Sequence, residues 1–258
     1  MIRYIIICFF VFPSLLFSQA GRIEPNRPDQ SENSSLVPKG LFQIETGFVF
    51  EKDESGSTSD KNYTYPTLQF RYGLFENLEV RAQLDNYYSR SSPKTISGET
   101  SVKKGVKPLS LGLKMYMFRE NGLLPEASFT FSFLLPEFGS ADLQVENLGA
   151  TGELSFSNSL TRNLSLTYNL GASWPGSSAE SVINYNVSFG YDIHKYITVF
   201  SEVYGYAPEK AQADHRFDFG LTYFPLNNLA FDASAGFGIT SNAPDYFING
   251  GFSFRIPE

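Results

Sequence analysis

The chain of 258 residues has one cysteine, Cys8, and two histidines, His194 and His215. Cys8 lies in a segment that reads as a cleaved signal peptide, so the mature protein would have no disulfide and no thiolate for catalysis or metal binding. The two histidines fall at opposite ends of the fold predicted below and therefore cannot share a metal site or a catalytic site. The sequence predicts no catalytic residue, no metal and no cofactor, and hence no enzyme.

Charged residues are also scarce, at 18% of the chain, and the formal net charge is −7. Nucleic-acid binding relies on clustered Lys and Arg that displace counterions, so this composition argues against a nucleic-acid partner. Beyond the N-terminus the sequence has no apolar run long enough for a transmembrane helix. If the chain enters a membrane, it must do so as a closed β-barrel, because only closure pairs every backbone group of a sheet in lipid.

The first twenty residues have the three parts of a secretory signal peptide. Arg3 supplies the positive charge, residues 4–17 form the apolar core, and Ser18-Gln19-Ala20 is a small-x-small cleavage site. A signal anchor is the alternative, but Pro13 interrupts an apolar core that is already short for a membrane span. We expect residues 1–20 to be removed and the protein to be exported into the bacterial cell envelope.

Strict alternation dominates the rest of the sequence and is clearest in residues 181–193, where every odd position from 183 onward is apolar and the even positions are small or polar. A period of two gives a strand one apolar and one polar face. The pattern recurs through residues 40–258 with no amphipathic helix between repeats. It predicts about twelve strands near the ~9 to 11 residues that a tilted membrane strand needs. Two polar stretches, 52–62 and 89–106, are expected to be long loops.

An outer-membrane barrel explains these strands better than a soluble β-sandwich or a lipocalin-like fold, whose strands are commonly only ~5 to 6 residues long. Short connections alternate with longer ones, as expected when tight turns face the periplasm. Both termini then lie on the periplasmic side. Aromatic residues near the strand ends could form interfacial girdles, namely Tyr63, Tyr88, Trp174, Tyr223 and Tyr246.

We therefore predict an all-β, transmembrane, antiparallel up-and-down barrel of about twelve strands in the bacterial cell outer membrane. Its expected partners are outer-membrane lipids, a small-molecule solute and the outer-membrane barrel assembly machinery. The chain ends Arg-Ile-Pro-Glu instead of with an aromatic residue, so we expect the machinery to recognise Phe252 and Phe254.

Residues 21–39 are polar, contain three prolines and show no periodicity, which predicts a periplasmic leader or plug. Residues 26–32 (Asn-Arg-Pro-Asp-Gln-Ser-Glu), 37–40 (Val-Pro-Lys-Gly) and 43–48 (Gln-Ile-Glu-Thr-Gly-Phe) resemble the outer-membrane family named for the MetA pathway of phenol degradation. The resemblance implies a β-barrel transporter and no enzyme, although members often have an acidic residue where this chain has Asn26. Through Arg27 and Asp29 the leader would either gate the pore or simply cover the barrel end.

Taking the apolar faces as lipid-facing puts more acidic than basic residues in the lumen. A narrow lumen amplifies fixed charge, so this balance predicts a preference for cations or neutral solutes over anions. Alternatively, the charges neutralise one another and fill a small barrel. The candidate selectivity residues, expected near mid-barrel, are Glu45, Arg71, Arg81, Asp192 and Glu202. Inward aromatic residues could form a path for organic solutes or merely pack the lumen: Tyr87, Tyr116, Phe118, Phe200, Tyr204 and Phe247.

The function predicted from these features is a channel for passive uptake or efflux of small organic solutes. One alternative is a closed barrel with a structural or adhesive role, in which case external loops would matter more than the lumen. A second alternative is an outer-membrane lipid hydrolase, which would depend on His215 as its base.

Overall fold

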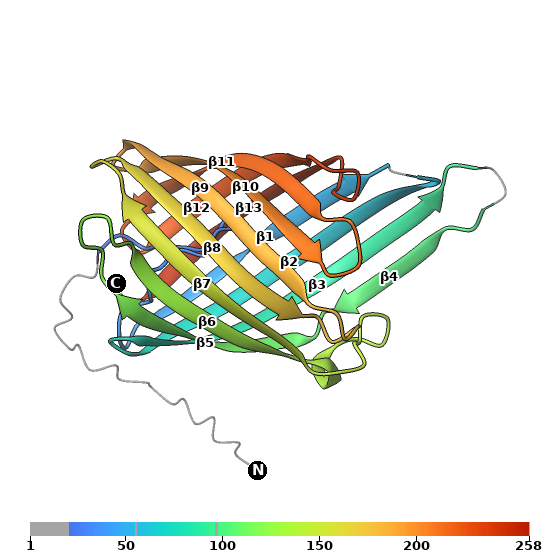
Figure 1. The fold of residues 1–258 in the computed structure, drawn as a ribbon, viewed down its shortest axis with the longest axis horizontal. Helices are drawn as coiled ribbons and strands as arrows, with labels where there is room; N and C mark the ends of the chain where they lie inside the picture. Colours follow the sequence, from blue (N-terminus) through green and yellow to red (C-terminus); the bar gives the residue numbers. More distant parts are fainter. Residues whose placement is uncertain (1–20, 55, 96–97, 258) are drawn as a thin grey trace, which may run out of the picture.

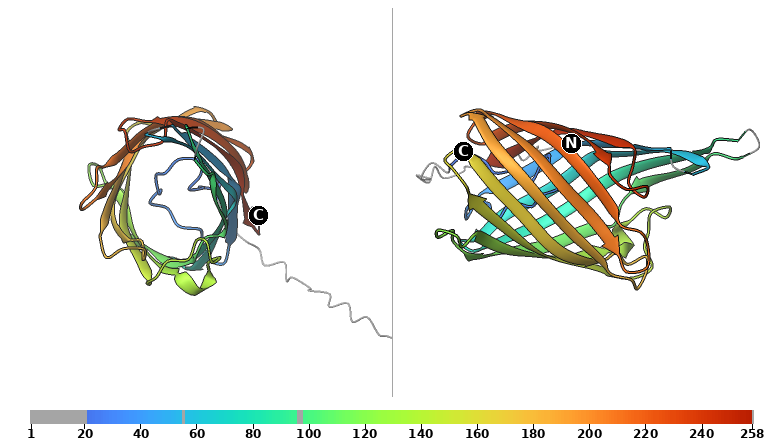
Figure 2. Two further views of the ribbon diagram at one scale, coloured as in Figure 1. Left: turned by 90° about the vertical axis from the view of Figure 1, so that its right-hand side faces the viewer. Right: turned by 45° about the horizontal axis from the view of Figure 1, so that its top comes forward.

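The computed structural model describes residues 21–54, 56–95 and 98–257, which form a closed antiparallel β-barrel. Figure 1 shows the barrel from the side, and Figure 2 shows it along its axis. No helix among these residues is long and apolar enough to cross a membrane. The predicted signal peptide, residues 1–20, lies outside the described residues.

The strands follow one another around the wall in sequence order. Their bounds are β1 (Phe42–Asp53), β2 (Thr58–Phe75), β3 (Leu78–Pro93), β4 (Ser101–Val106), β5 (Leu109–Phe118), β6 (Glu126–Leu135), β7 (Gly149–Ser159), β8 (Leu164–Trp174), β9 (Val182–His194), β10 (Ile197–Pro208), β11 (Asp214–Leu226), β12 (Leu229–Gly238) and β13 (Tyr246–Ile256). A single turn of 3-10 helix, η1 (Pro136–Phe138), follows β6.

The barrel closes where β1 pairs with β13, in a register that runs from Phe42 opposite Ile256 to Lys52 opposite Tyr246. Thirteen strands make twelve positions around the wall because β4 and β5 both pair with β3. The break between them contains Pro108, which has no N–H to donate to the neighbouring strand. The predicted twelve-stranded antiparallel barrel is confirmed, with one of its strands interrupted.

The outer surface is apolar, as the alternation predicted. On β5, for example, Leu111, Leu113, Met115 and Met117 are exposed on the outside while Lys114 is fully buried on the inside. The five predicted girdle residues are exposed as well. Because hydrocarbon covers such a surface in the membrane, burial in this protein increases toward the lumen instead of toward a central apolar core.

A charge placed on this outer surface measures how strongly lipid stabilises the fold. We expect Leu221→Arg, on the outer face of β11 two residues from the girdle residue Tyr223, to lower the free energy of unfolding by about 1–3 kcal/mol. This lies between the ~2–4 kcal/mol cost of a cation at the bilayer midplane and the ~0–1 kcal/mol cost at the interface. Urea unfolding in lipid vesicles measures this, and Leu221→Phe is the matched control. If both variants unfold like the wild type, then β11 does not face lipid at this position.

Two stretches that we expected to be loops continue as strands. β1 reaches Asp53 and β2 begins at Thr58, while β3 reaches Pro93 and pairs with β4. The expected loops 52–62 and 89–106 are therefore wrong. This part of the sheet, here called the extension, projects beyond the rest of the barrel at the end opposite the tight turns (Figure 1). Outside lipid, both faces of a strand can be polar, so the hydrophobic alternation is lost while the backbone pairing continues.

Tight turns, such as the one between β2 and β3, lie at one end of the barrel (Figure 1). Strand β13 and the leader also end there. In outer-membrane barrels the short turns face the periplasm, so the extension faces outward from the cell.

Candidate functional site: the leader inside the barrel

Residues 21–41, which include the predicted leader 21–39 and are called the leader from here on, enter the barrel from the periplasmic end and loop through its lumen before β1 begins (Figure 2). Ile23 is fully buried against Phe224 and Ala230, and its N–H donates to the carbonyl of Asn227 at 2.6 Å. Arg22 forms an ion pair with Asp192 at 3.3 Å and stacks over the ring of Phe224. These contacts fix the start of the leader against β9, β11 and β12.

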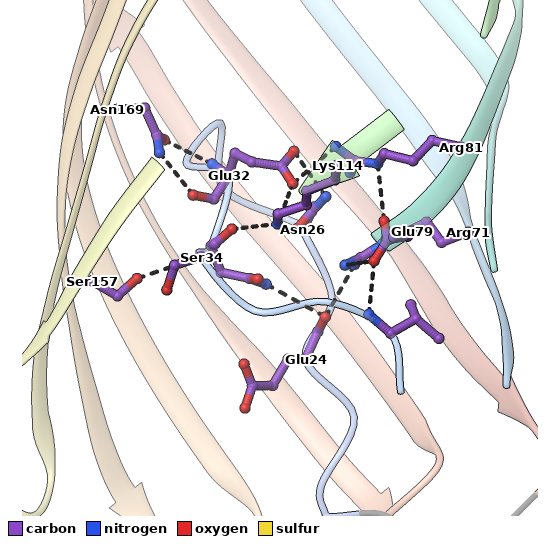
Figure 3. A network of polar contacts seen from close by, with 12 residues as sticks. Glu24, Asn26, Glu32, Ser34, Arg71, Glu79, Arg81, Lys114, Ser157 and Asn169 are labelled. Carbon is purple, nitrogen blue, oxygen red and sulfur yellow. Dashed lines mark hydrogen bonds and ion pairs between the residues drawn. The ribbon is translucent and has the colours of Figure 1, made fainter. Parts of the chain in front are cut away.

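Further along, the leader binds a group of buried charges on one side of the wall, which we call the charge cluster (Figure 3). Glu32 of the leader forms ion pairs with Arg81 of β3 at 2.9 Å and with Lys114 of β5 at 2.7 Å. Both cations are buried, with no more than 7% exposed surface. The cluster consists of Glu32, Glu45, Arg71, Glu79, Arg81 and Lys114.

The charge cluster is balanced, since its three carboxylates face three cations. Arg71 lies between Glu45 and Glu79, at 2.8 Å from each. Burial opposes ionisation of Glu32, but the neighbouring Arg81, Lys114 and Arg71 outweigh it and hold its pKa well below the ordinary value. Removing one member would leave a buried charge without its partner, which is much more costly than the net stabilisation that an intact pair provides.

The leader backbone is also held by wall side chains. The N–H of Asn26 donates to Glu45 at 2.9 Å, and the carbonyl of Glu24 accepts from Arg71 at 3.2 Å. The N–H of Val37 donates to Glu79 at 2.7 Å. A buried backbone group must find a partner, and here the charge cluster supplies several partners at once.

The opposite side of the wall binds the same stretch of the leader. The Ser31 hydroxyl donates to Glu202 of β10 at 2.6 Å and lies 3.1 Å from Oδ1 of Asn186 of β9. Asn169 of β8 exchanges two hydrogen bonds with the backbone of Glu32, at 2.8 and 2.9 Å, in the manner of a neighbouring strand. The leader therefore bridges the lumen between β3 and β5 on one side and β8, β9 and β10 on the other.

Arg27 crosses the seam at which the barrel closes. Its guanidinium forms an ion pair with Asp232 of β12 at 3.3 Å and donates to Thr67 of β2 at 3.2 Å. It lies over Gly47 of β1 and Gly251 of β13, which pair with each other, and a Cβ at either glycine would collide with it. The two inward-facing glycines thus make the space that Arg27 occupies.

Asp29 lies near wall carboxylates instead of cations. Burial, and then the charges of Glu202 and Asp218, raise the pKa of Asp29 well above its ordinary value. Asp218 is fully buried and lies directly opposite Glu202 on the paired strand, so the two carboxyl groups meet on this side of the lumen. The two sides of the lumen therefore differ in charge. Acidic and basic residues balance on the side of β3 and β5, whereas acidic residues are in excess on the side of β10 and β11.

Two cavities lie in the barrel, and the leader separates them. The outer cavity, about 520 Å³, is lined by residues toward the extension, including Glu51, Lys107 and Arg216. The inner cavity, about 420 Å³, is lined by residues toward the periplasmic turns, including Arg162 and Asp192. Arg27 and Asp29 line both cavities. At these two residues the leader faces both cavities.

Aromatic residues line both cavities: Phe200 and Phe224 lie at the inner cavity, and three others lie at the outer cavity. Tyr204, Tyr206 and Phe247 line it, and the guanidinium of Arg216 lies 5.8 to 5.9 Å from each of their ring centres. Arg216 is held by ion pairs with Glu51 and Asp214, both at 2.6 Å. His215 contacts Tyr185, whereas His194 ends β9 at the periplasmic end. No group of His, Cys, Asp or Glu in the described part of the chain is arranged to hold a metal ion.

The structure divides the predicted selectivity residues among three places. Glu45, Arg71 and Arg81 belong to the charge cluster, and Glu202 binds the leader from the other side. Asp192 lies two residues from the end of β9, so its expected position near mid-barrel is wrong. All five side chains bond to the leader. Glu45, Arg71 and Glu202 bond to its backbone, and Glu202 also bonds to the Ser31 side chain. Asp192 bonds to Arg22, and Arg81 bonds to Glu32.

Sequence reasoning missed Glu32, Asn169 and Asn186 as site residues. Glu32 lies in the stretch 26–32 that carries the family resemblance, but without the wall positions nothing distinguished it from a solvated acid. Asn169 and Asn186 occupy inward positions of β8 and β9, where a polar residue is expected in any barrel. Their position opposite the leader backbone comes only from the folded barrel.

A closed, lipid-facing barrel with a polar lumen and an internal leader defines the class of protein as an outer-membrane β-barrel. Residues 25–256 match the model of the family described as "Putative MetA-pathway of phenol degradation", and the chain belongs to that family. No curated protein sequence matches the chain.

Solved structures share the fold at low sequence identity. An outer-membrane channel from Pseudomonas putida F1 matches with a TM-score of 0.67 and 13% identity, over 91% of this chain and 100% of that one. The translocator domain of the autotransporter NalP from Neisseria meningitidis matches with a TM-score of 0.55 and 12% identity, over 84% and 89%. The KdgM porin matches with a TM-score of 0.51 and 12% identity, over 82% and 98%.

Proposed function

We propose that the protein is an outer-membrane channel for passive passage of small organic solutes, and that the leader is its gate. The observation that carries the proposal is the leader itself, which separates an outer from an inner cavity and is bound from both sides of the wall. A barrel with a purely structural role has no need of two lumenal cavities around an ordered segment. Removing or shifting this one segment would join them into a continuous passage.

A small aromatic compound is the solute class that the outer cavity favours. Tyr204, Tyr206 and Phe247 offer ring faces and edges, and Arg216 among them adds a cation to the same cavity. Aromatic rings pair favourably with such surfaces. The family description refers to phenol degradation, and the similar structures include an outer-membrane channel and a porin. Insertion of the protein into the membrane would require the barrel assembly machinery.

A reversible cross-link tests whether the leader gates. The side chains of Ser31 and Asn186 point toward each other, with 3.1 Å between Oγ and Oδ1, so cysteines at these positions are directed at one another. A thiol assay of the oxidised double variant verifies that the disulfide has formed. Once residues 1–20 are cleaved, no native cysteine competes. We expect the oxidised double variant Ser31→Cys/Asn186→Cys to stay closed in a planar bilayer, and the reduced protein to open as the wild type does.

Each single-cysteine variant serves as the control, because neither can form the internal disulfide and both should ignore oxidant. Equal conductance of the oxidised and reduced double variant would rule out the leader as the gate. The structural or adhesive alternative makes a different prediction: the barrel would insert and stay silent under every redox condition.

A further inference from the structure

A hollow of about 500 Å³ lies on the extension, outside the lumen and apart from the leader. It is lined by three residues of β2 and the three residues of β3 that pair with them. The lining pairs are Ser59 with Ser92, Lys61 with Arg90, and Tyr63 with Tyr88. Two hydroxyls, two cations and two phenols therefore converge on one surface.

The hollow is on the lipid-facing side of the sheet. Tyr63 and Tyr88 are exposed there, 6.0 Å apart between ring centres, and Tyr63 continues onto Phe50 of β1 at 4.9 Å. The next residues, Asn62 and Tyr87, point to the other face, where they bond to each other at 2.9 Å. The hollow thus begins at the aromatic girdle and continues outward along the extension.

Its height matches the headgroup layer of the outer leaflet. Lys61 and Arg90 are two residues beyond the tyrosines, or about 7 Å along a strand. The headgroup region of a bilayer extends about 5–7 Å beyond the hydrocarbon on each side. If the tyrosines mark the hydrocarbon boundary, as aromatic girdles do, then the two cations are level with lipid headgroups.

Among the described residues, no acid forms an ion pair with the cations of the hollow: the nearby Glu54, which also interacts with the charge of Lys61, is ion-paired with Lys52 at 2.6 Å. Lys61 and Arg90 lie directly across from each other on paired strands, an arrangement that is destabilising for like charges. No ion pair of the described part of the chain includes either residue, and none of the six lining side chains is a carboxylate. Lys104, opposite Tyr88 on β4, adds a third cation to the same face. An anion bound between Lys61 and Arg90 would relieve this repulsion.

We propose that the hollow binds a phosphate group of the phosphorylated glycolipid of the outer leaflet, lipid A. Lys61 and Arg90 would contact the phosphate, with Arg90 suited to bidentate binding. Ser59 and Ser92 would donate hydrogen bonds to its oxygens or to the sugar, and the tyrosine rings would pack against the adjoining glycolipid. The site is independent of whether the barrel conducts.

Native mass spectrometry of the full protein, purified in detergent from outer membranes, tests this site with synthetic lipid A. We expect the wild type to retain bisphosphorylated lipid A, and Lys61→Ser/Arg90→Ser to bind it about tenfold or more weakly, as two cations near a membrane surface would imply. The control Lys103→Ser/Lys195→Ser removes the same charge from the other face of β4 and from a periplasmic turn. It should bind within about twofold of the wild type.

Equal binding by the two double variants would overturn the proposal, as would equal binding of dephosphorylated lipid A by the wild type. Displacement of lipid A by an equimolar amount of inorganic phosphate would show a site for free anions and would overturn the lipid assignment. Heat-modifiable migration in gels confirms that each variant retains its barrel, so a loss of binding cannot be mistaken for unfolding.

Discussion

Deleting residues 22–35 is expected to convert a closed barrel into one with large, continuous conductance. The deletion removes the partition between the outer and inner cavities, and it keeps the contacts of Val37 with Glu79 and of Gly40 with Gly73 at the leader's exit. Water can then enter the lumen and solvate the wall charges that the leader neutralised. Single-channel recording in a planar bilayer should show discrete steps several-fold larger than any openings of the wild type.

The barrel itself should survive the deletion, because β1 still pairs with β2 and β13 and no strand is shortened. Heat-modifiable migration and resistance to protease provide that control. A deletion variant that folds, inserts and stays silent would contradict the channel function, whatever the cross-linked protein does. The structural or adhesive role would then be favoured, and external segments such as the extension would become the place to search for function.

Glu32→Gln is the point substitution from which we expect the largest effect. It removes the leader carboxylate that pairs with Arg81 and Lys114; Arg81 keeps Glu79 at 3.2 Å, but buried Lys114 is left facing a neutral amide. Breaking a buried ion pair by removing one partner costs about 3–5 kcal/mol. A loss of about 3 kcal/mol would shift the docking equilibrium of the leader roughly a hundredfold toward release.

Two readouts separate release of the leader from a general loss of stability. The released leader should be cut by trypsin at Arg22 while the barrel remains intact, and the conductance should approach that of the deletion variant. Glu24→Gln is the matched control, since the Glu24 side chain is exposed and only its backbone carbonyl bonds to the wall. If Glu32→Gln and Glu24→Gln behave alike, then the charge cluster does not hold the leader.

The fold could be predicted from the sequence because lipid imposes one rule on every strand of the wall. Side chains such as Leu113 and Met115 had to alternate with inward residues such as Lys114, and the alternation was visible without a structure. The rule fails where lipid ends. Residues 58–62 and 89–93 are polar on both faces, so their strands in the extension were mistaken for loops.

The leader could be predicted only in part. Its prolines and lack of periodicity separated it from the strands, and the stretch 26–32 indicated a shared role. Its path depends on groups that are far apart in the sequence: Glu32 meets Lys114, and Ser31 meets Asn186. Glu45 and Glu202, two of the inward charges predicted to determine ion selectivity, are bonded to the leader. Their effect on ions can be judged only with the leader displaced.

The position of Arg27 bears on the order of events during biogenesis. Its partners, Thr67 and Asp232, belong to the second and the second-to-last strands, and the paired glycines beneath it belong to the first and the last. Thr67 already lies opposite Gly47 within the first two strands, and Asp232 opposite Gly251 within the last two, but these two pairs come together only when the ends of the sheet have met. Arg27 can therefore reach its final position only after the seam has formed. A nascent barrel with an open seam has no docked leader, so sealing of the cylinder and occlusion of its lumen are successive stages of maturation.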